Sequence, residues 1–117
     1  MENPVVAIEP QYLTTSTATY YTVPTGGDAQ WAWVDHFTVL NIHTTTDYTV
    51  TVYFVPEGGT AGLDNVVLNA VLLDHTDLRP DTCPELIGRL LKSGDTIQAK
   101  ASANSAIQIA CNVREVS

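Results

Sequence analysis

The stretch "YTVTVYFVPEGG" (48–59) decides the fold class. Valine and phenylalanine at positions 50, 52 and 54 alternate with threonine and tyrosine, which is the pattern of a half-buried β-strand. Pro56 cannot donate a ladder hydrogen bond, and Gly58 and Gly59 allow a tight turn, so the strand should end there. Neither a helix pattern nor a nearby basic residue follows the glycines, so we expect the corner of a sheet rather than an anion-binding loop.

Similar short segments recur along the chain between turn clusters such as "VPTGGDA" (23–29) and "LKSGDTI" (91–97). They are rich in Val, Ile, Thr, Tyr and Phe, and this spacing is typical of an all-β sandwich or barrel. We predict strands near 4–8, 18–23, 31–43, 48–55, 66–73, 86–91, 96–102 and 106–114. The segment "PELIGRLLK" (84–92) also has apolar residues at helical spacing, so a single helical turn or a bulged strand fits there.

A hairpin is predicted between residues 36–42 and 48–54. One register gathers most apolar side chains on a single face, because side-chain direction alternates along a strand. It pairs Ile42 with Tyr48, Leu40 with Val50, Thr38 with Val52 and His36 with Phe54. A slip by one residue would place Phe37, Val39, Asn41 and His43 on that face instead, and we prefer the first register.

The charge distribution excludes some partners. The chain has a net charge of −8, and residues 1–78 hold nine acidic residues with no lysine or arginine. Nucleic-acid binding needs basic side chains to neutralise phosphates, so neither nucleic acid nor an acidic membrane surface is an expected partner. The first residues lack a basic region before an apolar run, and no stretch reaches the ~20 apolar residues of a membrane span, so we expect folding in a cytoplasm.

Catalytic and metal-binding patterns are weak in this sequence. Asp35-His36, Asp74-His75 and His43 raise the possibility of a metal site or an acid–base pair, but adjacent residues of a strand point to opposite faces. We therefore expect structural or surface histidines. Cys83 and Cys111 lack metal-ligand spacing and are expected as reduced thiols. No nucleophile elbow is present, and we predict no enzyme activity, no catalytic residue, no metal and no cofactor.

Two regions are candidates for interaction. Trp31 and Trp33 are two residues apart and share one face of a strand, where they could serve as core, as a partner interface or as a sugar platform. Residues 1–17 suit an extended arm ahead of a sandwich domain at 18–117, and this arm could add a strand to a neighbouring subunit or pair within its own domain. The predicted partner contacts are Val5, Val6, Ile8, Tyr12, Trp31 and Trp33.

Four segments in order resemble a group of small virion structural proteins of tailed bacteriophages: "YYTVPTGG" (20–27), "TVTVYFVPEGGTAG" (49–62), "LLKSGDTIQAKASANSAIQI" (90–109) and the closing "VREVS". The likeness covers about residues 20–117. It implies a jelly-roll-like antiparallel β-sandwich of about eight strands. The family has no catalytic residues to transfer. This sequence departs from its pattern at Trp31, Trp33, the loop "RPDTCPELIG" and the long N-terminal segment.

The resemblance implies a capsid decoration or cement protein, assembled in the host cytoplasm and located in the virion. Such a protein would bind the outer surface of the phage head and stabilise it. Its partners would be the major capsid protein or other virion proteins and further copies of itself, with a trimer as the expected form. One alternative is a component of the neck, tail or fibre. Another is a carbohydrate-binding module that stacks sugars on Trp31, Trp33 and Tyr53.

Overall fold

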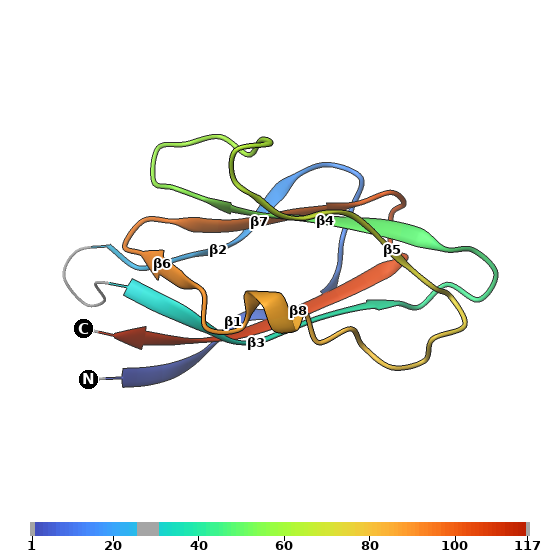
Figure 1. Ribbon diagram of the computed structural model, residues 1–117, viewed down its shortest axis with the longest axis horizontal. Coiled ribbons are helices and arrows are strands. Elements are labelled where there is room, and N and C mark those ends of the chain that lie inside the picture. The colour runs from blue at the N-terminus through green and yellow to red at the C-terminus, as the bar shows by residue number, and fades with distance from the viewer. Residues whose placement is uncertain (1, 26–30, 117) are drawn as a thin grey trace.

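The computed structural model describes residues 2–25 and 31–116 (Figure 1). Within them the chain forms eight β-strands and one 3₁₀ turn. The elements are β1 (Glu2–Tyr12), β2 (Ala18–Thr22), β3 (Trp31–Asn41), β4 (Tyr48–Val55), β5 (Val66–Leu73), η1 (Pro84–Leu86), β6 (Leu90–Lys92), β7 (Thr96–Ala101) and β8 (Ile107–Val116). All eight predicted strand regions correspond to a strand, although the one predicted at 86–91 is reduced to β6.

The strands form two antiparallel sheets that pack face to face, in the orders β1-β8-β3-β6 and β2-β7-β4-β5 (Figure 1). The first strand pairs with the last, the second with the seventh, the third with the sixth and the fourth with the fifth. The chain is thus one long hairpin folded over on itself, and this strand order is that of the jelly roll. The predicted all-β sandwich is confirmed.

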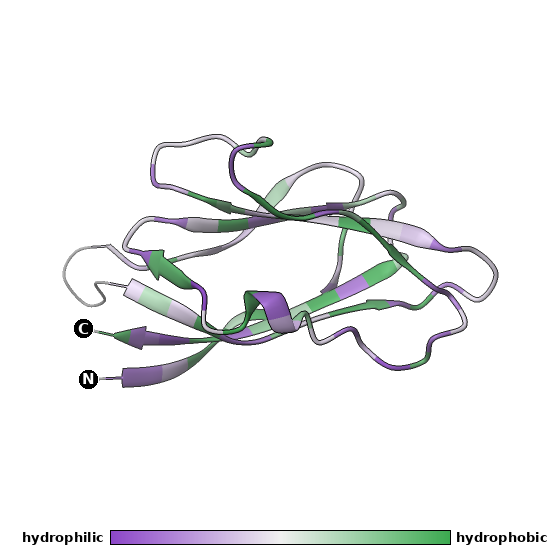
Figure 2. Ribbon diagram, viewed as in Figure 1, coloured by the Kyte–Doolittle hydropathy of each residue, from purple (hydrophilic) through white to green (hydrophobic). Residues whose placement is uncertain are grey.

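The core lies between the two sheets and is built from alternate residues of each strand. Along β8, Ile107, Ile109, Cys111 and Val113 are buried, and the residues between them point outward. Figure 2 shows the resulting mixture of hydrophobic and polar positions along the strands. Phe37 from one sheet meets Phe54 from the other with ring centroids 6.5 Å apart. Burying each large apolar side chain contributes about 1.5–3 kcal/mol, so this layer is the main source of stability.

The predicted hairpin between residues 36–42 and 48–54 is wrong. β3 pairs with β6 and β8, whereas β4 pairs with β5 and β7, so residues 42–47 cross from one sheet to the other. The predicted inward face of β3 is also wrong, because Phe37 and Val39 are buried while His36 is exposed. A bulge between Val34 and His36 shifts the alternation by one residue and causes this change. In β4 the prediction is correct, since Val50 and Val52 are fully buried.

Turn chemistry ends β4 as its sequence predicts. Gly58 has a φ of 76°, and the Gly59 N–H donates to the Pro56 carbonyl at 2.8 Å. Between Cys83 and Lys92 the helical turn is confirmed as a 3₁₀ turn at Pro84–Leu86, and it is followed by a regular three-residue strand, β6, in place of a bulged one. Residues 26–29 of the predicted turn "VPTGGDA" lie outside the described residues.

Residues 2–12, within the expected N-terminal arm, form an edge strand of the sandwich. β1 pairs with β8 of the same chain, from Glu2 opposite Val116 to Tyr12 opposite Gln108. Leu13 follows directly, is fully buried, and donates its N–H to the Ile107 carbonyl at 2.9 Å. Of the two alternatives for this segment, the structure has the pairing within its own domain.

Candidate functional site

The outer face of the sheet β1-β8-β3-β6 presents the two tryptophans. Ala32 and Val34 point into the core, so Trp31 and Trp33 point outward and are 38% and 36% exposed. Trp33 lies opposite Leu90 of β6 on one side and Arg114 of β8 on the other. Large aromatic side chains on a regular sheet lose little conformational freedom when they bind, which makes them effective contacts. Among the three uses left open for the tryptophans, a place in the core is therefore wrong.

The four other predicted contact residues divide between the two sides of β1. Val6 and Tyr12 are 57% and 49% exposed and lie opposite Asn112 and Gln108, two outward positions of β8. Ile8 is only 1% exposed, and Val5 packs against the core. Bulges after Val6 and Ile8 change the alternation along the strand. We call the outward set of Val6, Tyr12, Trp31, Trp33 and Leu90 the aromatic face.

A charged pair is part of this face. The Arg114 Nε donates to the Asp35 Oδ2 at 3.3 Å, and both side chains are partly buried. Asp35 is the residue that the bulge of β3 inserts, so the bulge brings its carboxylate within reach of Arg114. The guanidinium is therefore held in the row beside Trp33, where it adds a directed polar contact to a largely apolar surface.

Tyr53 lies on the other sheet from the tryptophans, so these three residues cannot form one sugar-binding platform. It lines a separate groove of about 510 Å³ together with Thr49, Thr51, Lys100 and Ser102. The groove crosses the outer face of the sheet β2-β7-β4-β5. Any stacking of sugars on Tyr53 would thus be independent of the aromatic face.

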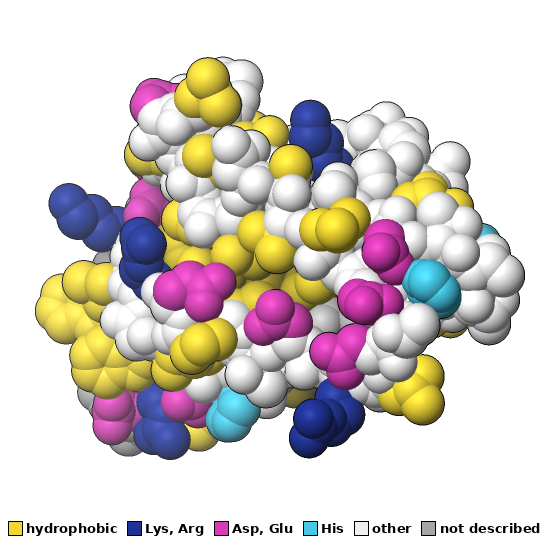
Figure 3. Space-filling model, turned by 45° about the vertical axis from the view of Figure 1, so that its right-hand side comes forward, with side chains coloured by type: hydrophobic (Ala, Val, Ile, Leu, Met, Phe, Trp, Pro, Cys, Tyr) yellow, Lys and Arg dark blue, Asp and Glu magenta, His cyan; other side chains and the backbone are white. Residues whose placement is uncertain are grey.

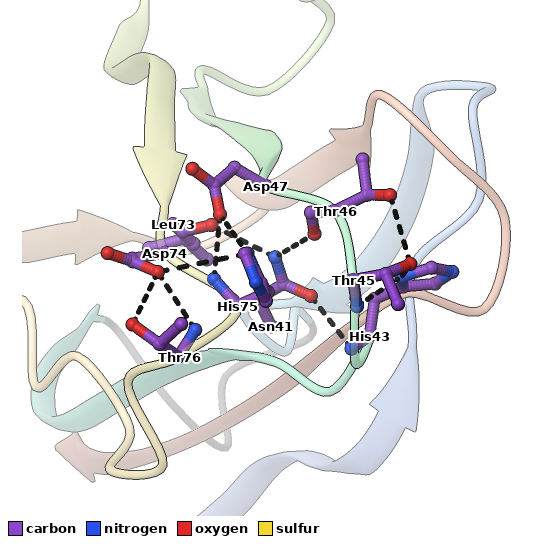
Figure 4. Close-up of polar contacts among 9 residues, drawn as sticks. All are labelled: Asn41, His43, Thr45, Thr46, Asp47, Leu73, Asp74, His75 and Thr76. Atoms are coloured by element: carbon purple, nitrogen blue, oxygen red, sulfur yellow. Dashed lines mark hydrogen bonds and ion pairs between the residues drawn. The ribbon is translucent and has the colours of Figure 1, made fainter.

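Asp47, Asp74 and His75 form a polar cluster where the 42–47 crossing meets the turn after β5 (Figure 4). The backbone N–H and the ring Nδ1 of His75 both contact the Asp47 Oδ1, at 2.9 and 2.6 Å. Because a carboxylate can only accept, Nδ1 must be the protonated ring nitrogen. The Asp74 Oδ1 accepts hydrogen bonds from the N–H and the hydroxyl of Thr76, both at 2.8 Å.

These hydrogen bonds lower the pKa of both carboxyl groups. The main cause is the backbone N–H of His75 for the pKa of Asp47, and the backbone N–H of Thr76 for that of Asp74. The Oδ1 atom of each carboxylate and the Nδ1 of His75 are thus hydrogen-bonded within the protein. Asn41 adds to the same junction, because its amide donates to the carbonyls of Thr46 and Leu73 at 3.0 and 2.9 Å. We interpret the cluster as a clamp between the two sheets.

The sequence did not reveal this clamp, because the alternation argument applied to Asp74-His75 assumes an extended strand. β5 ends at Leu73, and residues 74–77 form a turn in which adjacent side chains can reach one partner. The signal available in the sequence was the position of Asp74 directly after an apolar run and two residues before Thr76, which is the pattern of an Asx turn. His36 is exposed and His43 half-buried, and His43 packs edge-on against Tyr48.

The two cysteines are free and buried. Burial raises the pKa of Cys83 and of Cys111 to about 12, so both thiols stay protonated at neutral pH. A nucleophilic or redox-active cysteine needs a lowered pKa and exposure, and these residues have neither. Cys111 lies opposite Ile8 of β1 and belongs to the core, as the strand pattern predicts.

No protein-family model, no curated protein and no solved structure matches this chain. The resemblance to virion proteins of tailed phages therefore gains no support from these comparisons. No helix in the described part of the chain is long and apolar enough to span a membrane.

Proposed function

We propose that this is a non-enzymatic structural protein of a virion that acts by protein–protein contact through its aromatic face. Its most specific form is a decoration or cement protein on the outer surface of a phage head, bound to the major capsid protein and to further copies of itself as a trimer. A place in the neck, tail or fibre is an alternative that would use the same surface. In either location the protein adds buried area to contacts between other virion subunits.

The observation that carries this proposal is the outward pair Trp31 and Trp33 with Leu90 beside them. Exposed aromatic side chains grouped on one face are typical of interaction sites. An interface of about 1,600 Å² is sufficient for specific, stable association. The jelly roll supports the proposal by analogy of fold only, because capsid proteins and lectins both use it.

Sedimentation velocity and co-sedimentation with empty phage heads test the proposal together. The wild-type protein should sediment as an oligomer and pellet with the heads. A Trp31→Ala/Trp33→Ala variant should be monomeric and remain in the supernatant, because it loses the contact area without losing core residues. Tyr53→Ala removes a partly exposed aromatic side chain from the opposite sheet and should behave as wild type. A wild-type monomer that does not pellet would contradict the proposal.

Carbohydrate binding is a second candidate function because of the groove around Tyr53. Threonine and serine hydroxyls and the Lys100 ammonium surround this aromatic ring, and sugar recognition combines such polar groups with an aromatic surface. Retention on a glycan array that disappears in Tyr53→Ala and persists in the double tryptophan variant would favour this function. No retention of the wild type on any glycan would remove it.

A further inference from the structure

One side of the sandwich, between β5 and the segment from Asp81 to Lys92, has no full-length strand facing β5. β5 has eight residues, whereas β6, the edge strand of the facing sheet, has three. The rest of that facing edge is formed by η1 and by irregular backbone, which touches β3 through single contacts such as those of Asp81 with Val39. In Figure 1 these elements face the viewer. Buried Leu68 and Leu86 close the middle of this side, so the sheets are separated by hollows only at the two ends of β5.

Two hollows lie at the two ends of β5, and each is lined by both apolar and polar side chains. The first, of about 290 Å³, is lined by Phe54, Val66, Val67, Leu90 and Leu91, among others. The second, of about 170 Å³, includes Val39, Leu40, Leu72 and Leu73. Figure 3 shows hydrophobic side chains at the bottom of a hollow on this side, with acidic side chains along its border. Leu72 is 64% exposed, so apolar area remains available beside the strand.

The backbone of β5 offers hydrogen-bonding groups to this side. β4 is its only ladder partner in the described structure, so alternate N–H and C=O groups point away from β4. β5 contains no proline that would block pairing. A bulge at Asn69 and Ala70, where Ala70 has a φ of 49°, divides the edge into two short parts. An edge divided in this way favours pairing with one short strand of a partner and disfavours the edge-to-edge addition of many strands.

Charge indicates which partner fits. Five carboxylates line the two hollows, and only the guanidinium groups of Arg79 and Arg89 oppose them. The carboxylates belong to Asp64 and Asp95 at one end and to Asp74, Asp77 and Asp81 at the other. The N-terminal segment of a second copy does not complement them, because residues 2–12 contain Glu2 and Glu9 and no basic residue.

We propose that the outer edge of β5 and the acidic hollows beside it bind an extended segment of another protein, in which apolar residues alternate with lysine or arginine. Main-chain hydrogen bonds to β5 provide the pairing, and every second side chain of the segment, which is apolar, points into the hollows. The basic side chains point to the opposite side, and those at the two ends of the segment meet the exposed carboxylates of Asp64 and Asp74, which flank β5. This surface shares Leu90 with the aromatic face, but it lies along the edge of the sandwich beside β5 and does not include Trp31 or Trp33. The proposal holds whether or not the protein belongs to a virion.

The test uses a fluorescein-labelled peptide of about ten alternating valine and lysine residues, the length of a typical long strand. Fluorescence anisotropy should show binding to the wild-type protein. Two matched peptides separate the contributions: alternating valine and glutamate should not bind, and a fully N-methylated valine–lysine peptide should bind far more weakly because it cannot pair with β5. Equal binding of the N-methylated peptide would reduce the effect to charge attraction and overturn the proposal.

Two protein variants locate the site. Leu72→Arg removes apolar area and adds a like charge at the groove, so we expect affinity for the valine–lysine peptide to fall at least about tenfold. Leu63→Arg makes the same change at a leucine that is 86% exposed and lines neither hollow, so it should leave the affinity nearly unchanged. The Trp31→Ala/Trp33→Ala variant should also bind normally, which separates this site from the proposed function. Equal losses in Leu72→Arg and Leu63→Arg, or no binding by the wild type, would overturn the assignment.

Discussion

The edge strands β1 and β5 have opposite characters. β1 contains Pro4 and Pro10, which cannot donate to a further strand, whereas register irregularities interrupt both strands. β5 contains no proline, and two hollows lined by apolar and acidic side chains lie beside it. Prolines are a common means of protecting a sheet edge. The segment that the sequence suggested as an interaction arm is thus the edge with prolines, and β5, for which the sequence suggested no contact, is the edge without them.

The largest expected effect comes from deleting residues 1–13. If β1 closes the sandwich, the deletion removes two buried side chains, Ile8 and Leu13, and exposes β8. The loss should exceed ~5 kcal/mol, which is comparable with the whole stability of a domain, so the truncated protein should not unfold cooperatively. Near-ultraviolet circular dichroism during heating measures this. A sharp transition at the wild-type temperature would instead mean that the segment is a dispensable arm.

A matched pair of substitutions compares the strands directly. Ile8→Ala should lower the free energy of unfolding by about 2–5 kcal/mol, because a buried side chain is replaced by a cavity. Leu72→Ala on β5 should change it by only ~0.5 kcal/mol, because most of that side chain is exposed. Urea unfolding gives both values. Similar losses for the two variants would break the contrast between a protected and an open edge.

Alkaline pH should weaken the core between the two sheets. The buried thiols of Cys83 and Cys111 have a pKa raised to about 12, and the unfolded chain releases these protons near pH 9. Their contribution is therefore complete below pH 9 and is lost as the pH rises toward 12. Tyr21 acts in the same direction, because burial and the 2.6 Å hydrogen bond to Glu115 raise the pKa of its hydroxyl.

The melting temperature of the wild-type protein should fall as the pH rises from 8 to 12. The melting temperature of Cys111→Ala should fall less steeply over the same range. Cys111 lies opposite Ile8, so its ionisation acts on the β1–β8 pair. A decline with the same slope in Cys111→Ala would show that this thiol does not contribute.

The smallest effect is a local loss of stability at the end of β5 when the pH is lowered. Hydrogen bonds from His75 and Thr76 lower the pKa of Asp47 and Asp74. The stability that they contribute is present above the ordinary pKa of a carboxyl group and is lost as the pH falls through the lowered values. Both groups are exposed, so the effect should be local. Amide exchange in residues 42–48 and 74–77 should accelerate in Asp47→Asn, whereas exchange in β1 should not change.

The sequence predicted the strands well because alternation and turn residues are local signals. Pro56 with Gly58 and Gly59 marked the end of β4, and the alternation around Val50 identified its buried face. Strand pairing was not predictable in the same way. β3 and β4 are adjacent in sequence and have compatible patterns, but they face each other across the core. Two strands with the same alternation can be hydrogen-bonded neighbours in one sheet, or they can lie in different sheets and pack across the core. Alternation alone does not distinguish these two arrangements.

The candidate site was predicted only in part. The spacing of Trp31 and Trp33 correctly placed both on one side of a strand, but spacing does not indicate which side faces the core. Bulges in β1 and β3 reverse that assignment locally, and no residue type in the sequence marks them. The open edge of β5 was missed, because an edge is defined by the absence of a neighbouring strand and so depends on the whole topology.

The pairing of the first strand with the last has a consequence for the order of folding. β4 and β5 are joined by a ten-residue loop, so their contact is the most local of the four hairpin pairs. Each further pair outward closes a longer stretch of chain, and β1 with β8 closes nearly all of it. During synthesis β1 must wait, unpaired, until β8 has left the ribosome. Its prolines would protect the nascent chain throughout that interval.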